Sequence, residues 1–230
     1  MSSYTLEFCP ICGSNQFSYC GVLWADLIEA WQLSGDEAAY INRQQGFHCV
    51  ICGNNLRSMA LASAVCRAFD FTGNLIDFCN TRGDLRVLEI NTTGNLTPYF
   101  NLMSHHILVE YPAFDMQDLK ITQSDFDLVV HSDTLEHVPN PERGLSECLR
   151  LLNSTGKCIF TIPIIVDRFT RSRVGLSPSY HGRSEVLADD QLVCTEFGAD
   201  FWKTVLKSGF RTCEIYSFEY PAAMALICQK

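Results

Sequence analysis

Polar side chains that could move a proton gather at the end of a short apolar segment in the middle of the chain. Residues 127–131 (DLVVH) are rich in β-branched residues, which is typical of a strand buried on both faces of a parallel sheet. His131, Asp133 and His137 lie at or just beyond its end. Imidazoles and carboxylates can accept a proton near neutral pH, so all three are candidate general bases. They could equally cap the strand and the following helix, and both interpretations stay open.

A helix and a second strand must follow if these residues are to face a ligand. Asn140 and Pro141 suit the first positions of a helix, and the apolar residues that follow fall on one helical face up to a stop at 153–156. Residues 158–162 predict the next strand. Strand, helix and strand of this length normally form a right-handed parallel crossover, in which ligands bind beyond the carboxyl ends of the strands.

Composition limits the possible functions. The chain has 230 residues, 47% of them hydrophobic, which is enough for one compact α/β domain with a small appendage. A net charge of −9 argues against a nucleic-acid surface and favours a small-molecule partner. The start of the chain lacks the pattern of a signal peptide, and the longest apolar run is too short to cross a bilayer. We therefore expect a cytoplasmic protein without a membrane partner, and the sequence predicts no oligomeric state.

Two CxxCG turns near the amino terminus predict a metal site. They supply Cys9, Cys12, Cys49 and Cys52, and 36 residues separate the turns. Four thiolates at this spacing are typical of a structural zinc ion, which leaves no coordination position open for chemistry. Redox-active pairs, an iron–sulfur cluster, or substitution by Cys20 or His48 are the alternatives. Most other cysteines lie in apolar patterns and are expected in the core.

Helical patterns surround these turns. Residues 24–42 predict two short helices interrupted at Ser34 and Gly35. The apolar stripe of Trp24, Leu27, Ile28 and Trp31 is expected to pack in the core, and an aromatic partner surface is the alternative. Residues 56–69 predict an amphipathic helix, capped by Asn54 or Asn55, that docks the appendage on the sheet. We therefore divide the chain into a zinc-knuckle and helical module at 1–70 and a catalytic domain at 71–230.

Two carboxylates follow the predicted strands of the first half of that domain. Residues 84–90 and 106–110 read as strands, and the second ends in Glu110, 21 residues after Glu89. A carboxylate at the tip of the adjacent strand can accept hydrogen bonds from both hydroxyls of a ribose. Asp115 could accept from an adenine amine. Each carboxylate could also be simply solvated.

The chain resembles the class I S-adenosylmethionine-dependent methyltransferases over about residues 85–228, and a subgroup with an amino-terminal cysteine knuckle through 49–57. The resemblance is carried by VLEI at 87–90, Glu110, DMQDL at 115–119, FDLVVHSDTLEHV at 126–138, ECLRLLNSTGKCIFTIP at 147–163 and FGADFWKTVLKSGF at 197–210. It implies an α/β, Rossmann-like fold with a seven-stranded, mostly parallel sheet whose last strand is reversed.

The same resemblance implies S-adenosylmethionine as cofactor. The residues that it places at the cofactor are Glu89, Asn91, Thr93, Gly94, Glu110, Asp115, Met116 and His131. One departure from the family pattern is the loop 91–95 (NTTGN), which has a single, displaced glycine where several normally let the backbone approach the cofactor.

The polar segment 167–198 is expected to roof the pocket of the methyl acceptor. It contains Arg168, Arg171, Arg173 and Arg183, which could hold an anionic acceptor, and His181 is a second candidate base. A solvated loop is the alternative for this segment.

Methyl transfer to a small-molecule or sugar-containing acceptor, at oxygen, is the leading functional hypothesis. The alternative is a non-catalytic module that keeps the fold but has lost the cofactor through the altered loop. A nicotinamide dehydrogenase is disfavoured because no GxGxxG follows a predicted strand, and a zinc-ribbon nucleic-acid binder is disfavoured by the acidic charge.

Overall fold

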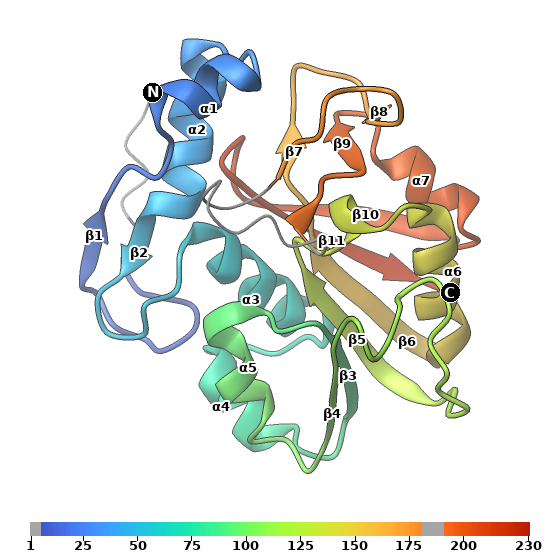
Figure 1. Ribbon diagram of the computed structural model, residues 1–230. Helices are drawn as coiled ribbons and strands as arrows, with labels where there is room; N and C mark the ends of the chain where they lie inside the picture. Colours follow the sequence, from blue (N-terminus) through green and yellow to red (C-terminus); the bar gives the residue numbers. More distant parts are fainter. Residues whose placement is uncertain (1–5, 181–190) are drawn as a thin grey trace.

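A six-stranded sheet forms the centre of the computed structural model, which describes residues 6–180 and 191–230 (Figure 1). Its spatial order is β10-β11-β6-β5-β3-β4. The strands are β3 (Arg86–Ile90), β4 (His105–Val109), β5 (Phe126–Ser132), β6 (Leu152–Thr161), β10 (Thr212–Glu219) and β11 (Ala223–Gln229). β4, β3, β5 and β6 are parallel, whereas β11 runs antiparallel to both of its neighbours. The resemblance implies seven strands, and the described residues supply six to this sheet.

Helices cover both faces of the sheet, as expected for parallel strands with apolar residues on both sides. Leu128 and Val130 of β5 pack into one hydrophobic cluster with α3 (Leu56–Ala68) and α4 (Leu75–Thr81). Val129, which points the other way, packs with α6 (Pro141–Leu151) and α7 (Trp202–Lys207). The result is a three-layer α/β architecture.

The predicted crossover is confirmed, because β5 leads through α6 into β6. Asn140 caps α6 by accepting a hydrogen bond from Arg143 N at 3.0 Å. β6 begins at Leu152, six residues before the predicted strand 158–162. Leu152 already pairs with Phe126 of β5, and an irregularity in the register separates this pair from the rest of the pairing. Gly156 lies at this irregularity, where a Cβ atom would be 2.5 Å from the carbonyl oxygen of Phe126. Glycine thus permits the close approach of the two strands.

The amino-terminal segment contains the predicted pair of short helices. α1 (Ala25–Ala30) and α2 (Gly35–Gly46) lie between β1 (Phe17–Tyr19) and β2 (Phe47–Cys49), which pair antiparallel. Ser34 interrupts the helices as predicted, because it caps α2 in a capping box with Glu37.

α3 follows directly and joins this segment to the rest of the molecule. Asn55 caps it, as one of the two predicted candidates, by accepting from Ser58 N at 3.1 Å. The helix packs against β6, β10 and β11, which confirms the predicted docking on the sheet. The division of the chain at residue 70 stays a prediction.

A second small sheet follows β6. It contains β7 (Ile164–Ile165), β9 (Thr195–Gly198) and β8 (Arg171–Ser172), in that spatial order. Figure 1 shows it above one end of the main sheet, with α1 and α2 at the same end. In the described ranges, every helix is too short or too polar to cross a bilayer.

Candidate functional site

A cavity of about 740 Å³ opens where the parallel strands of the main sheet end. Its lining includes residues directly after β3, β4 and β5, together with α1, α2 and the segment after β6. The volume lies within the roughly 300–1,000 Å³ typical of cofactor and small-ligand sites. The carboxyl ends of parallel strands are also the usual place for a ligand in an open α/β sheet.

Glu110 lies at the tip of β4 and faces this cavity. It is solvent exposed, and in the described part of the chain no hydrogen bond or ion pair occupies its carboxylate. Both oxygens are therefore available to a ligand with two neighbouring hydroxyl groups. The role of Glu110 as acceptor of the ribose hydroxyls stays a prediction.

Asn91 takes the place of a glycine at the end of β3. Its φ of 55° lies in the left-handed region, which asparagine tolerates better than most residues. Its side-chain oxygen accepts from Tyr111 N at 2.9 Å, and this contact ties the ends of β3 and β4 together. Asn91 lines the cavity. Because its φ is positive, the glycine-poor loop still makes a turn that usually requires glycine.

Glu89, Thr93 and Gly94 do not line the cavity. Glu89 is completely buried, and its carboxylate accepts hydrogen bonds from Thr93 N and Oγ1 at 2.7 Å, Thr97 Oγ1 at 2.5 Å and His106 Nε2 at 2.8 Å. Burial by itself raises the pKa of Glu89, but these hydrogen bonds outweigh it and hold the pKa below its ordinary value. The structure therefore gives Glu89 and Thr93 a part in fixing the loop, away from any ligand in the cavity.

Asp115 and Met116 both line the cavity. Asp115 accepts from Gln117 N at 2.8 Å, and Gln117 Nε2 lies 3.3 Å from each carboxylate oxygen, so both oxygens are partly used in a local turn. Met116 is buried and lies against Gly144 of α6. Met116 can offer an apolar surface to a flat ring, while Asp115 can offer its remaining acceptor capacity.

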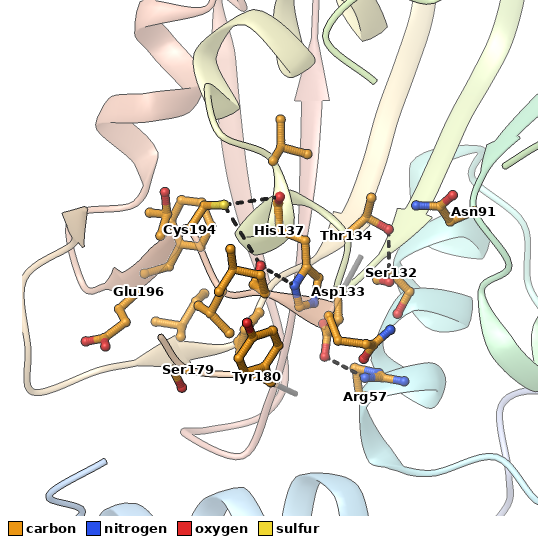
Figure 2. Close-up of a pocket in the computed structure, with 18 of the residues that line it drawn as sticks. Arg57, Asn91, Ser132, Asp133, Thr134, His137, Ser179, Tyr180, Cys194 and Glu196 are labelled. Atoms are coloured by element: carbon orange, nitrogen blue, oxygen red, sulfur yellow. Dashed lines mark hydrogen bonds and ion pairs between the residues drawn. The ribbon is translucent and has the colours of Figure 1, made fainter. Parts of the chain in front are cut away.

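Asp133 lies in the cavity wall as part of a hydrogen-bonded group. It accepts from Arg57 Nη1 at 2.5 Å (Figure 2). It also accepts from Thr161 Oγ1 at 2.9 Å. Its φ of 44° is again left-handed, which turns the chain sharply after β5. Both carboxylate oxygens already accept hydrogen bonds from side chains of the protein, so the contacts favour a positioning role for Asp133 over the predicted catalytic one.

His137 lies in the short 3₁₀ helix η2 (Leu135–His137) and lines the cavity. Its Nδ1 is 3.0 Å from the carbonyl oxygen of Leu192. Since a carbonyl can only accept, Nδ1 donates, and the carbonyl fixes the orientation of the ring. Nε2 lies 3.5 Å from Glu136 Oε1. Of the predicted bases among the described residues, His137 has the most suitable position.

His131 lies in the core, away from the cavity. It has no exposed surface and stacks on Phe160 with the ring centroids 4.5 Å apart. Burial lowers the pKa of His131 to about 3, although nearby Asp133 opposes this shift. A neutral, enclosed ring cannot contact a ligand in the cavity, which corrects the catalytic and cofactor roles predicted for this residue. The predicted base His181 lies outside the described residues.

The arginines of segment 167–198 are already paired where they are described. Arg168 makes two hydrogen bonds to the Glu37 carboxylate, at 2.7 and 2.8 Å, and Arg171 and Arg173 both pair with Glu196. Arg183 falls outside the described ranges. Since the guanidinium groups of Arg168, Arg171 and Arg173 are already paired, they give no support for an anionic acceptor.

The four predicted cysteine ligands converge on one point. Their sulfur atoms all lie within 4.8 Å of one another, with Cys9 to Cys52 and Cys12 to Cys49 both at 3.7 Å. A tetrahedral zinc ion with Zn–S bonds of about 2.3 Å requires sulfur atoms about 3.8 Å apart. Gly13 and Gly53 complete both turns with positive φ angles of 75° and 69°. The cluster could therefore bind a metal ion.

Arg57 and helices α1 and α2 are the parts of the site that sequence reasoning missed. Arg57 appears in the sequence only as a residue after the second cysteine turn, yet it lines the cavity, and its buried Nε has no hydrogen-bond partner in the described residues. For Trp24, Leu27 and Trp31 the sequence predicts packing in the core. Their spacing along one helical face was visible, but their approach to the strand ends depends on contacts distant in sequence.

Residues 49–160 match the family model described as a methyltransferase domain, just under half of the chain. Curated relatives are the ubiquinone biosynthesis O-methyltransferases of Coxiella burnetii strains Dugway 5J108-111 and RSA 493 / Nine Mile phase I. Each is 30% identical over 132 residues, which cover 53% of this chain and 47% of the relative. The chain thus spans about half the length of the curated relatives it matches.

Solved structures of methyltransferases are also similar. An S-adenosylmethionine-dependent methyltransferase of Thermotoga maritima, described as a possible histamine N-methyltransferase, has a TM-score of 0.43 and 17% identity, and the match covers 76% of this chain and 90% of that one. One from Mesorhizobium loti has a TM-score of 0.40 and 13% identity, covering 67% and 94%. Scores of this size do not by themselves establish a shared fold. The domain match and the curated relatives support an enzyme that carries a methyltransferase domain.

Proposed function

We propose that the protein transfers the methyl group of S-adenosylmethionine to an oxygen atom of a small-molecule or sugar-containing acceptor. The observation that carries this proposal is the free carboxylate of Glu110 at the tip of β4, facing a cavity of about 740 Å³ at the strand ends. The methyltransferase-domain match over residues 49–160 and the O-methyltransferase relatives support the choice of reaction and of oxygen.

Four residues are proposed to hold the cofactor. Glu110 accepts hydrogen bonds from the ribose hydroxyls, Met116 packs against the adenine ring, and Asp115 accepts from the adenine amine. Arg57, whose side chain lines the cavity, is proposed to donate from its guanidinium group to a carboxylate such as that of the methionine part. When bound, the cofactor would supply an electrophilic methyl carbon on a sulfonium, which the acceptor oxygen attacks in line as the bond to sulfur breaks and the neutral thioether leaves.

His137 is proposed to accept the proton of the acceptor hydroxyl. The carbonyl of Leu192 orients its ring through Nδ1, and in the neutral ring this leaves Nε2 as the acceptor atom. The fixed walls around the cavity contribute mainly by aligning the two reactants, since the displacement needs no covalent intermediate.

Cys9, Cys12, Cys49 and Cys52 are proposed to hold a structural zinc ion. The 3.7 Å sulfur spacings fit a tetrahedral Cys₄ site, in which the ion crosslinks the chain and has no open position. A cytoplasmic location and the division at residue 70 belong to the same proposal.

Transfer of an isotopically labelled methyl group tests the activity. Purified protein is incubated with methyl-labelled S-adenosylmethionine and a metabolite extract, and the products are analysed by mass spectrometry. We expect labelled products with an oxygen-bound methyl group, and formation at least 100-fold slower with His137→Ala. The absence of labelled products from the wild type, together with no binding of S-adenosylhomocysteine at millimolar concentration, would favour the non-catalytic alternative.

A further inference from the structure

The cavity has two chemically different halves. The cofactor half consists of the residues after β3, β4 and β5 that the proposed function assigns to S-adenosylmethionine. The other half, here called the acceptor half, lies between α1 and α2 on one side and the segment after β6 on the other. Trp24, Leu27, Trp31 and Ile41 line it from the helices, and Ile164 and Leu192 line it from the segment.

The wall from α1 is mostly apolar and aromatic. Trp24, Leu27 and Trp31 follow one another at intervals of three and four residues, so they lie on one face of the helix and its flanks. Trp24 remains 42% exposed, although large aromatic residues are normally more buried than this. An open aromatic face inside a cavity can be covered by a flat apolar ligand.

The cations around the acceptor half are engaged. Arg168 binds the Glu37 carboxylate and also donates to the carbonyl oxygens of Trp31 and Gln32, at 3.1 and 2.7 Å. Arg57 binds Asp133 at the boundary between the two halves, and the proposed function assigns its remaining donors to the carboxylate of the cofactor. Glu196 also lines the cavity, and Arg171 and Arg173 pair with it. Across residues 6–180 and 191–230, this half therefore presents apolar groups, neutral polar groups and charges that are already paired, and burying an anionic group against it would be costly.

The helices α1 and α2 on this side of the cavity are here called the helical wall. Contacts between residues distant in sequence hold it in place. Trp31 Nε1 donates to Ser179 Oγ at 2.9 Å, and Arg43 of α2 forms an ion pair with Glu219 of β10. The wall lies within residues 13–48, whose two ends are the converging cysteine turns. The amino-terminal segment is thus fixed at its ends and along its length.

From this geometry we infer that the amino-terminal segment forms the specificity wall of the acceptor half, and that this half binds an uncharged acceptor with an aromatic or similarly flat apolar body. The inference rests on the proposed function and adds the substrate class. It assigns the helices between the cysteine turns a role in recognition, and the hydroxyl of the acceptor points toward His137 and the cofactor half.

Calorimetric titration with two matched phenols tests this inference. Protein loaded with S-adenosylhomocysteine is titrated with 4-propylphenol, which is uncharged at pH 7, and with 4-hydroxybenzoate, which carries a carboxylate. We expect 4-propylphenol to bind at least ten-fold more tightly. We also expect Leu27→Asp to weaken its binding at least ten-fold, because the variant places a charge in the apolar wall.

Ala25→Asp is the matched control, since it adds the same charge to α1 at an exposed residue outside the cavity lining. Its affinity for 4-propylphenol should stay within three-fold of that of the wild type. Binding of S-adenosylhomocysteine to each variant reports whether the fold is intact. Three results would overturn the inference if the wild type binds S-adenosylhomocysteine: no binding of 4-propylphenol, tighter binding of 4-hydroxybenzoate, or equal effects of the two variants. The proposed function would then still stand. If the wild type does not bind S-adenosylhomocysteine, the proposed function fails with the inference.

Discussion

The cofactor half and the acceptor half of the cavity are built in different ways. Glu110, Asn91 and Asp133 of the cofactor half come from the ends of strands in the central sheet, so the backbone pairing of the sheet fixes their spacing. The acceptor half is assembled from α1, α2 and the segment after β6, which meet through side-chain contacts such as those of Trp31 and Arg168. We therefore expect the cofactor half to tolerate perturbations that open the acceptor half.

Removal of the metal should give the largest effect and should separate the two halves. In a Trp202→Phe background, which removes the exposed tryptophan of α7, chelation or Cys12→Ser should shift the emission of Trp24 and Trp31 to longer wavelength. The free energy of unfolding should fall by more than about 3 kcal/mol, because the metal crosslinks the ends of the helical wall.

Cys20→Ser is the control for the metal experiment, because Cys20 is exposed and lies outside the cysteine cluster. Metal analysis should find about one zinc ion per chain in this control and in the wild type. Unchanged emission and stability after complete removal of the metal would show that the wall holds without it.

Acidification should lower the free energy of unfolding through His131, which is buried in the core beneath the cofactor half. Its pKa is lowered to about 3 by burial, so between pH 6.5 and about 3 the unfolded chain binds the proton that the folded chain excludes. Stability from this group is complete above pH 6.5 and is lost as the pH falls, by up to about 1.4 kcal/mol per pH unit. Denaturant unfolding between pH 7 and 4 should show a shallower pH dependence in His131→Leu, and equal slopes would contradict the burial argument.

Glu89 adds to the acid sensitivity at lower pH. Because its pKa is held below the ordinary value, its contribution is present above about pH 4.5 and is lost as the pH falls through the folded pKa. This phase should persist in His131→Leu. Of these two groups, only His131 contributes to the loss of stability between pH 6.5 and 4.5, so that range tells them apart.

A matched pair of glycines tests the packing of the helical wall. A Cβ atom on Gly46 would lie 2.0 Å from the carbonyl oxygen of Cys20, whereas one on Gly35 would meet nothing within 4 Å. Gly46→Ala should therefore lower the free energy of unfolding by about 1–3 kcal/mol. Gly35→Ala should be neutral or slightly stabilising, because alanine favours a helix. Equal thermal unfolding of the two variants would contradict this account of the wall.

Local patterns were sufficient to predict most of the elements and the cysteine cluster. The Asn140 and Asn55 caps, the interruption at Ser34 and the β5–α6–β6 crossover all depend on residues close in sequence. The Cys₄ convergence was also predictable, because four thiolates at this spacing have few other uses.

Residues whose role depends on the direction of a side chain were harder to predict. β5 extends to Ser132, and His131 continues the alternation of Val129 into the α6 face, where it stacks on Phe160. The alternation of side chains along β5 was therefore a usable signal that His131 is buried. The pairing of Arg168 with Glu37 spans 131 residues, and no local pattern could reveal it.

Calorimetric titration with S-adenosylhomocysteine is the most direct test of the central claim that the strand ends bind this cofactor. We predict saturable binding to the wild type, a 10–100-fold loss of affinity in Glu110→Ala from two lost charge-assisted hydrogen bonds, and no change in Asp118→Ala, an exposed carboxylate outside the cavity lining. No binding to the wild type at millimolar ligand, or equal affinities of the two variants, would contradict the account.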